Sequence, residues 1–233
     1  LIPCAYFAHA QNVDPSKAIS VQGLDNLDVN RIIAEFTLGE TEFLEGFSRY
    51  GYKLDFDVQS VENGRVVAEY RRVSQVLLSK DGKLVEKILS FTRPSADIRV
   101  TQEDLENLGG QYQFALQSSN ANQYRFSYVG KERINNLDLY VFDVIPVALS
   151  SKRRLFRGRI WVGVDSLRIV KTRGKFEDKS DQRYPVVEMY RTAIDNKFLF
   201  PLTGSGNGEL IFGNVVSVHF NLRINYSDFV KLQ

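Results

Sequence analysis

The chain has 233 residues, 43% hydrophobic and 25% charged, a composition typical of a globular protein rather than of a disordered or fibrous one. Its 30 basic residues nearly balance 28 acidic ones, so the formal net charge of +2 gives no indication of a nucleic-acid partner. Because all-β domains commonly reach this length undivided, residues 11–233 are expected to form a single domain.

The first ten residues indicate the remnant of an export signal. An A-x-A cleavage pattern occupies residues 8–10, so the domain is expected to begin at residue 11, although an ordinary frayed terminus is an alternative. Lipidation of Cys4 is left open, because Pro3 stands where a lipobox requires a small residue. No stretch approaches the roughly 20 apolar residues that span a bilayer. We therefore expect an exported periplasmic protein without a transmembrane segment, with association with the outer membrane left open.

An amphipathic helix is predicted over residues 28–49, with Asp28 as its N-terminal cap. Its apolar positions follow the three-and-four spacing of one buried face: Val29, Ile32, Ile33, Phe36, Phe43, Leu44 and Phe47. Four glutamates are assigned to its polar face: Glu35, Glu40, Glu42 and Glu45. Gly39 is expected to kink or divide the helix. The face that carries Ile32, Ile33, Phe36, Phe43 and Phe47 is expected to act as a lid over one mouth of the sheet.

From Tyr50 onward the pattern changes to an alternation with period two, which predicts strands. The expected strands cover 51–61, 65–79, 84–91, 123–133, 137–146, 155–163, 167–176, 186–194, 197–203, 208–212 and 215–226. A short second helix is predicted at 102–108, and the glycines at 204, 206 and 208 are expected to form a flexible loop. Since short turns connect the strands, the sheet should be antiparallel. The predicted fold class is mainly β (α+β): a curved antiparallel sheet forming an incomplete β-barrel, with an N-terminal helix and a short second helix on its concave side.

Alternation along the strands also predicts which side chains face the concave side. The expected lipid-binding residues of this face are Phe126, Tyr128, Phe142, Val144, Phe156, Ile160, Val162, Met189, Phe220 and Leu222. Arg157, Arg159, Arg223 and Asn225 are expected to point outward, and Trp161 to lie over the arginine stems on the convex side. A sheet this long has more apolar surface than its helices can hide, which favours a lined cavity; the alternative is a simple core under the helix.

The sequence offers little catalytic chemistry. Histidines occur only at positions 9 and 219, and a single cysteine cannot form a disulfide framework or a cysteine-based zinc cluster. The acidic groups, such as Asp55 and Asp57, lack a histidine partner and match no calcium-loop spacing. We therefore expect no catalytic residues, no metal and no cofactor, while two carboxylates that converge in space would leave a hydrolase open.

Several segments together resemble bacterial outer-membrane lipoprotein-sorting proteins of the LolA/LolB-like superfamily. They are Gly158 to Val162 with Asp165 to Thr172, Tyr128 to Glu132 with Tyr140 to Val144 and Pro146, and Tyr190-Arg191 with Ile194-Asp195 and Phe198 to Pro201. The resemblance runs from about residue 28 to 230. It implies an incomplete barrel closed on one side by helices, whose apolar interior receives lipoprotein acyl chains. No arginine aligns with the ligand-gating arginine of those carriers.

The expected function is that of a monomeric periplasmic carrier for lipoprotein acyl chains or another lipid. The first alternative is an envelope sensor or scaffold that uses the same fold to bind a protein partner. The second is an unrecognised hydrolase. A filled interior would favour the sensor, and an open apolar tunnel would favour the carrier.

Overall fold

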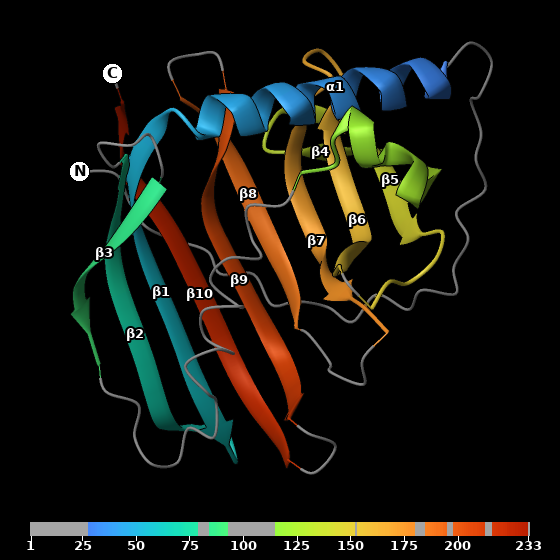
Figure 1. The fold of residues 1–233 in the computed structure, drawn as a ribbon. Coiled ribbons are helices and arrows are strands. Elements are labelled where there is room, and N and C mark those ends of the chain that lie inside the picture. The colour runs from blue at the N-terminus through green and yellow to red at the C-terminus, as the bar shows by residue number, and fades with distance from the viewer. Residues whose placement is uncertain are drawn as a thin grey trace.

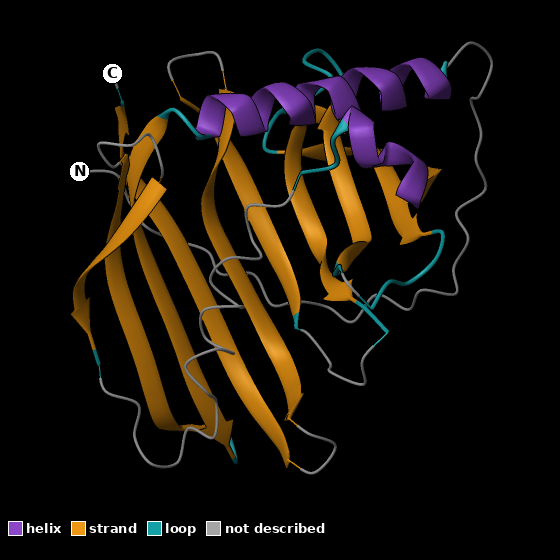
Figure 2. Ribbon diagram, viewed as in Figure 1, coloured by secondary structure: helices purple, strands orange, loops and turns teal. Residues whose placement is uncertain are grey.

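A computed structural model describes residues 28–78, 84–92, 115–151, 153–179, 185–194, 198–212 and 216–232. One α-helix, α1 (Val29–Phe47), one 3-10 helix, η2 (Ser118–Gln123), and ten strands make up the described fold (Figure 2). The strands are β1 (Tyr50–Glu62), β2 (Arg65–Leu78), β3 (Leu84–Phe91), β4 (Tyr124–Ile134), β5 (Leu137–Pro146), β6 (Leu155–Gly163), β7 (Ile169–Glu177), β8 (Val186–Ile194), β9 (Phe198–Phe212) and β10 (Val216–Lys231).

All ten strands belong to one antiparallel sheet in the order β3-β2-β1-β10-β9-β8-β7-β6-β5-β4. The pairing of β1 with β10 joins the first and last strands of the chain, and β3 and β4 form the two edges. The sheet curves without closing, and α1 lies across one end of its strands (Figure 1). The predicted mainly β fold with an incomplete barrel and an N-terminal helix is confirmed. The second helix predicted at 102–108 lies outside the described residues.

Two hairpin turns show why the chain reverses where it does. Asn63 and Gly64 connect β1 to β2 with φ of 49° and 74°, and Asn135 and Asn136 connect β4 to β5 with φ of 47° and 69°. Positive φ at both central residues is the geometry of the two-residue turns that match strand twist, and asparagine and glycine adopt it most readily. These local signals set the register of both hairpins.

The glycines at 204, 206 and 208 do not form the predicted loop. They lie inside β9, which joins the two strands expected at 197–203 and 208–212 into one. A Cβ atom on Gly206 would lie 2.8 Å from the Val186 carbonyl oxygen, and one on Gly204 would lie 2.6 Å from the Met189 side chain. The glycines therefore let β8 approach β9 closely, a role that composition alone does not distinguish from loop flexibility.

The two faces of the sheet differ as the alternation predicts. In β10, Phe220 and Leu222 are buried, whereas Asn221 and Arg223 are exposed. Ile160 is fully buried on the inner face. Its neighbour Arg159 points to the outer face, where it pairs with the Asp143 carboxylate. The inner, apolar face is the one that contacts α1.

Trp161 lies on the outer face, as predicted, but not over arginine stems. Its ring packs with Leu139 and Val141, and Nε1 donates a hydrogen bond of 2.7 Å to Glu132. The Lys171 ammonium lies 4.6 Å from the ring centroid. A lysine takes this place because register pairs Lys171 directly with Trp161, while Arg159 is held by Asp143.

We predict that Gly206→Ala lowers the free energy of unfolding by about 1–3 kcal/mol, because the added methyl group overpacks the β8–β9 contact. Ser205→Ala is the matched control: it changes the next residue of the same strand, on the exposed face, and should stay within about 0.5 kcal/mol of the parent. Urea unfolding measures both. Equal stability of the two variants would show that β9 tolerates a side chain at 206.

Candidate functional site

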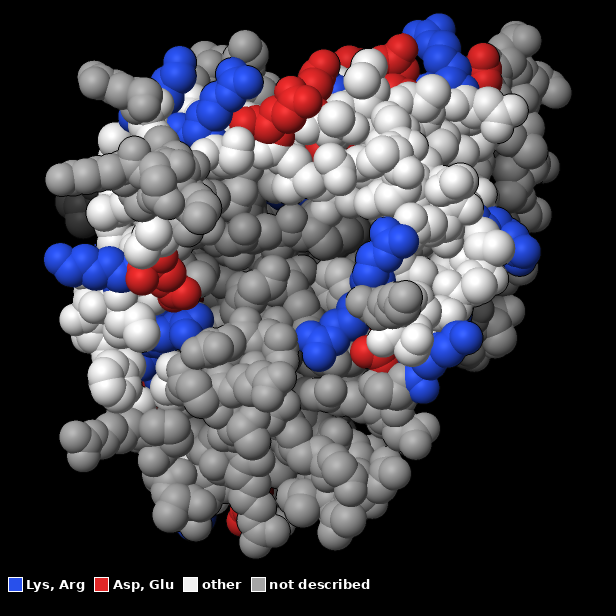
Figure 3. All heavy atoms as spheres, viewed as in Figure 1, with Lys and Arg blue, Asp and Glu red and all other residues white. Residues whose placement is uncertain are grey.

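The helix α1 begins at the predicted cap and follows the predicted apolar stripe. The Asp28 carboxylate accepts a hydrogen bond of 2.9 Å from the Arg31 backbone N–H. Ile32, Phe36, Phe43 and Phe47 are buried against the sheet, and Ile33 is half-buried. The exposed side carries Glu35, Glu42 and Glu45. Acidic and basic side chains gather along the upper edge of the molecule, where α1 lies in Figure 1 (Figure 3).

The first half of α1 packs on strands β4 to β7. The Phe36 ring lies 5.4 Å from the ring of Phe126 and 5.6 Å from that of Phe142, in the tilted and edge-on arrangements that aromatic pairs prefer. The same cluster contains the predicted residues Val144, Phe156, Ile160 and Val162, all buried, with Tyr128 and Phe126 half-buried at its margin.

The second half of α1 packs on β1, β2 and β8 to β10 in a separate cluster. The Phe47 ring lies 4.9 Å from Tyr52 and 5.2 Å from Phe200. The predicted residues Met189, Phe220 and Leu222 belong to this second cluster and are buried. The predicted inner residues are thus divided between two clusters that one helix joins.

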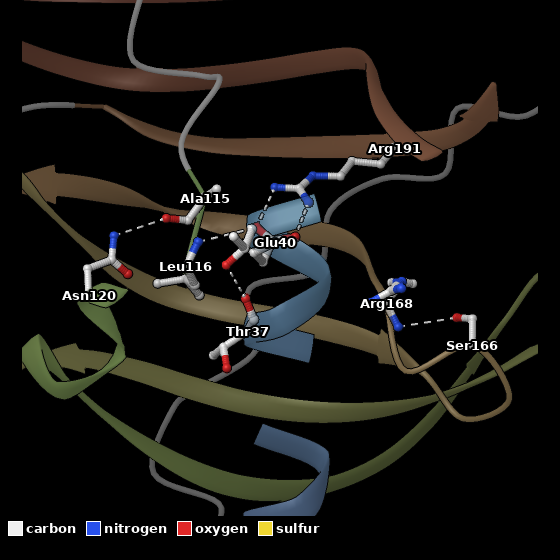
Figure 4. Close-up of polar contacts among 9 residues, drawn as sticks. Thr37, Glu40, Ala115, Leu116, Asn120, Ser166, Arg168 and Arg191 are labelled. Carbon is white, nitrogen blue, oxygen red and sulfur yellow. Dashed lines mark hydrogen bonds and ion pairs between the residues drawn. The ribbon is translucent and has the colours of Figure 1, made fainter. Parts of the chain in front are cut away.

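A buried ion pair lies between the two clusters. Glu40 on α1 accepts hydrogen bonds of 2.5 and 3.1 Å from the Arg191 guanidinium on β8, and their side chains are only 3% and 4% exposed (Figure 4). The Leu116 backbone N–H also donates to Glu40, at 3.3 Å, and the guanidinium lies 4.4 Å from the Phe43 ring centroid. Both charges are therefore compensated inside an otherwise apolar interface.

A second arginine, Arg168, contacts the same turn of α1 on its exposed side. Arg168, in the β6–β7 connection, donates a hydrogen bond of 2.5 Å to Glu42. Its side chain crosses the helix over Gly39, where a Cβ atom would lie 2.1 Å from the guanidinium. The prediction that Gly39 divides the helix is therefore wrong. The helix α1 runs unbroken from Val29 to Phe47, and the missing side chain at Gly39 makes room for Arg168.

Glu40 corrects the assignment of four glutamates to a solvated face. It follows Phe36 by four residues and precedes Phe43 by three, so the helical spacing places it on the buried stripe. Arg191 has the same parity as the inner residues Val187 and Met189 of its strand. These spacings are the signals that would have found the pair, although they do not say that the two residues meet.

The described residues hold little that indicates catalysis or membrane spanning. No group of three or more His, Cys, Asp or Glu side chains among them is placed to hold a metal ion. His219 is exposed on the outer face of β10. No helix in the described part of the chain is both long and apolar enough to cross a membrane.

Comparison with known proteins gives distant structural similarity only. No family model and no curated protein matches the chain. A DUF1329 family protein from Desulfovibrio piger is 16% identical, with 86% of this chain and 92% of that chain covered and a TM-score of 0.41. A domain described as an outer membrane lipoprotein-sorting protein from Vibrio parahaemolyticus is 13% identical, with 83% and 92% covered and a TM-score of 0.38.

A LolA superfamily protein from Nitrosomonas europaea is also similar, at 13% identity, with 84% of this chain and 94% of that chain covered and a TM-score of 0.37. The descriptions of the Vibrio and Nitrosomonas proteins agree with the resemblance that the sequence motifs carry. With TM-scores below 0.5 and identities below 25%, the similarity assigns no function.

We predict that Glu40→Ala lowers the free energy of unfolding by about 3–5 kcal/mol, because it leaves the Arg191 charge buried without a partner. Glu45→Ala, an exposed change one turn further along α1, should stay within about 0.5 kcal/mol of the parent. Chemical denaturation measures both. A double change of Glu40→Leu with Arg191→Met should recover most of the loss; a double variant as unstable as Glu40→Ala would contradict the ion-pair explanation.

Proposed function

We propose that the chain is a non-enzymatic binding protein that carries an apolar chain, such as the acyl chain of a lipid or lipoprotein, between α1 and the inner face of the sheet. The observation that carries the proposal is the single helix that closes two apolar clusters on one continuous sheet face. Each methylene group transferred to such an interior contributes about 0.8 kcal/mol, so an acyl chain needs no polar contact to bind. The proposed compartment is the periplasm, which the sequence resemblance implies.

Binding would require α1 to move, because side chains occupy the space beneath it. Phe36 is 0% exposed, as are Phe142 and Ile160 on the strands below. The helix joins β1 through Ser48 and Arg49 alone, which makes this two-residue connection the natural hinge. The Glu40–Arg191 pair lies in the middle of the moving interface and would have to separate.

Native mass spectrometry of the protein purified from the envelope of the producing cells tests the proposal directly. Bound acyl species, released on unfolding, are the expected result. A fluorescent fatty acid should bind saturably and be displaced by those species. Protein that is free of lipid and does not take up the fluorescent fatty acid would contradict the carrier function.

We predict that Phe36→Ala lowers the free energy of unfolding by about 3–5 kcal/mol and increases affinity for a fluorescent fatty acid about tenfold or more. The loss of a buried ring destabilises the closed position of α1 relative to the open, binding-competent one. Leu38→Ala is the matched control, since Leu38 is on the same helix and 50% exposed. If both variants unfold and bind like the parent, the helix is not a lid.

A filled interior was expected to favour a protein-binding sensor or scaffold, so the side chains packed beneath α1 support this alternative unless the helix moves. The edge strand β3 favours it independently: Val85, Ile88, Leu89 and Phe91 are 48–58% exposed, and in the described sheet β3 pairs only with β2. A free edge with apolar side chains can receive an extended segment of another protein as an additional strand. Cross-linking in intact envelopes should then place the partner at β3, whereas a carrier would show bound lipid instead.

A further inference from the structure

A polar cleft of about 530 Å³ lies on the outer face of the sheet, opposite α1. Its polar lining includes Gln59, Arg173, Ser205, Asn207, Asn221 and Arg223. Strand register explains the arrangement, because cross-strand pairing aligns Arg173, Glu188, Ser205 and Arg223 in one row across β7 to β10. The side chain of Ser205 is short, whereas those of its neighbours in the row, Glu188 and Arg223, are long, so the row leaves a hollow at Ser205.

The charge of this cleft is positive. Arg173 and Arg223 are exposed, and neither side chain forms a hydrogen bond or salt bridge with a residue that the structure describes, although the charge of Arg223 acts on the nearby carboxylates of Asp57 and Asp55. The one carboxylate of the lining, Glu188, is already engaged by the Lys171 ammonium at 3.1 Å and by the Tyr190 hydroxyl at 2.7 Å. Asp57 stands opposite Arg223 in register and does not line the cleft; burial raises the pKa of Asp57, and the charge of Arg223 opposes that rise.

The remaining polar groups of the lining are amides and a hydroxyl. Register places Asn207 opposite Asn221, and Asn221 opposite Gln59, as a second row beside the first. Side-chain amides donate and accept hydrogen bonds at the same time, which suits the hydroxyl groups of a sugar. Guanidinium groups pair most strongly with carboxylate or phosphate oxygens. A cleft of this volume lies within the range of about 300–1,000 Å³ found for small-ligand sites.

We propose that this cleft binds an acidic oligosaccharide, with its anionic groups at Arg173 and Arg223 and its hydroxyl groups at the amides of the adjacent row. The two arginines come from strands three positions apart, about 14 Å at the usual strand spacing. That separation favours two anionic groups on different sugar units over a single small anion. The site lies on the opposite face of the sheet from α1, so it is independent of acyl-chain binding.

Calorimetric titration of the full chain with trigalacturonate, a carboxylated trisaccharide, tests the assignment. Saturable binding is expected, with neutral maltotriose at least tenfold weaker because it lacks the carboxylates. Arg173→Ala and Arg223→Ala should each weaken trigalacturonate binding about tenfold or more. Arg125→Ala is the matched control, because Arg125 is an exposed arginine on β4 and outside the cleft lining.

Two further measurements separate sugar recognition from general attraction of anions. Asn221→Ala should weaken trigalacturonate binding while leaving the interaction with citrate, a small polyanion without sugar hydroxyls, unchanged. Unfolding midpoints equal to that of the parent would establish that the exposed variants fold. Citrate binding as tight as that of trigalacturonate, or unchanged affinity in the Arg173→Ala/Arg223→Ala double variant, would overturn the proposal.

Discussion

The ten strands present one apolar face that water would contact unless another layer covered it, and α1 packs against that face with one stripe of side chains. Because the strands lie side by side in sequence order from β4 to β9, the helix must cross several of them to reach both clusters. Its length allows this: the 19 residues of α1 extend over about 28 Å at 1.5 Å per residue. One helix can therefore join halves of the sheet that have separate cores.

The Glu40–Arg191 pair determines where along the sheet the helix rests. Apolar contacts alone are tolerant of sliding by a turn, whereas a buried carboxylate must meet its guanidinium or remain uncompensated. The pair therefore contributes positional specificity more than net stability. Arg168 reinforces the same position from outside, through a contact that only a glycine at 39 permits. The polar contacts concentrate at mid-helix, which leaves the ends held by apolar packing.

Sequence reasoning found the features that depend on local periodicity. The strand positions, the apolar stripe of α1 and the inner direction of Ile160 and Phe220 all follow from spacings of two or of three and four. What it missed depends on a neighbouring element: the burial of Glu40 requires Arg191, and the continuity of β9 through Gly206 requires the close approach of β8. The outer cleft was missed for the same reason, since it needs the register of five strands at once.

The inner face of the sheet is apolar and the outer face is polar because successive side chains of a strand point to opposite faces. Moving β10 by a single residue relative to its neighbours would bring Arg223 under the helix and expose Leu222, so the register that buries the apolar clusters also aligns the polar rows outside. The inner positions must be apolar because the helix covers them, which restricts the side chains that can stand there. The outer face has no such requirement in most sheets and tolerates any solvated side chain. Two exposed arginines at the ends of one cross-strand row, with a row of amides beside it, are therefore more specific than solubility demands.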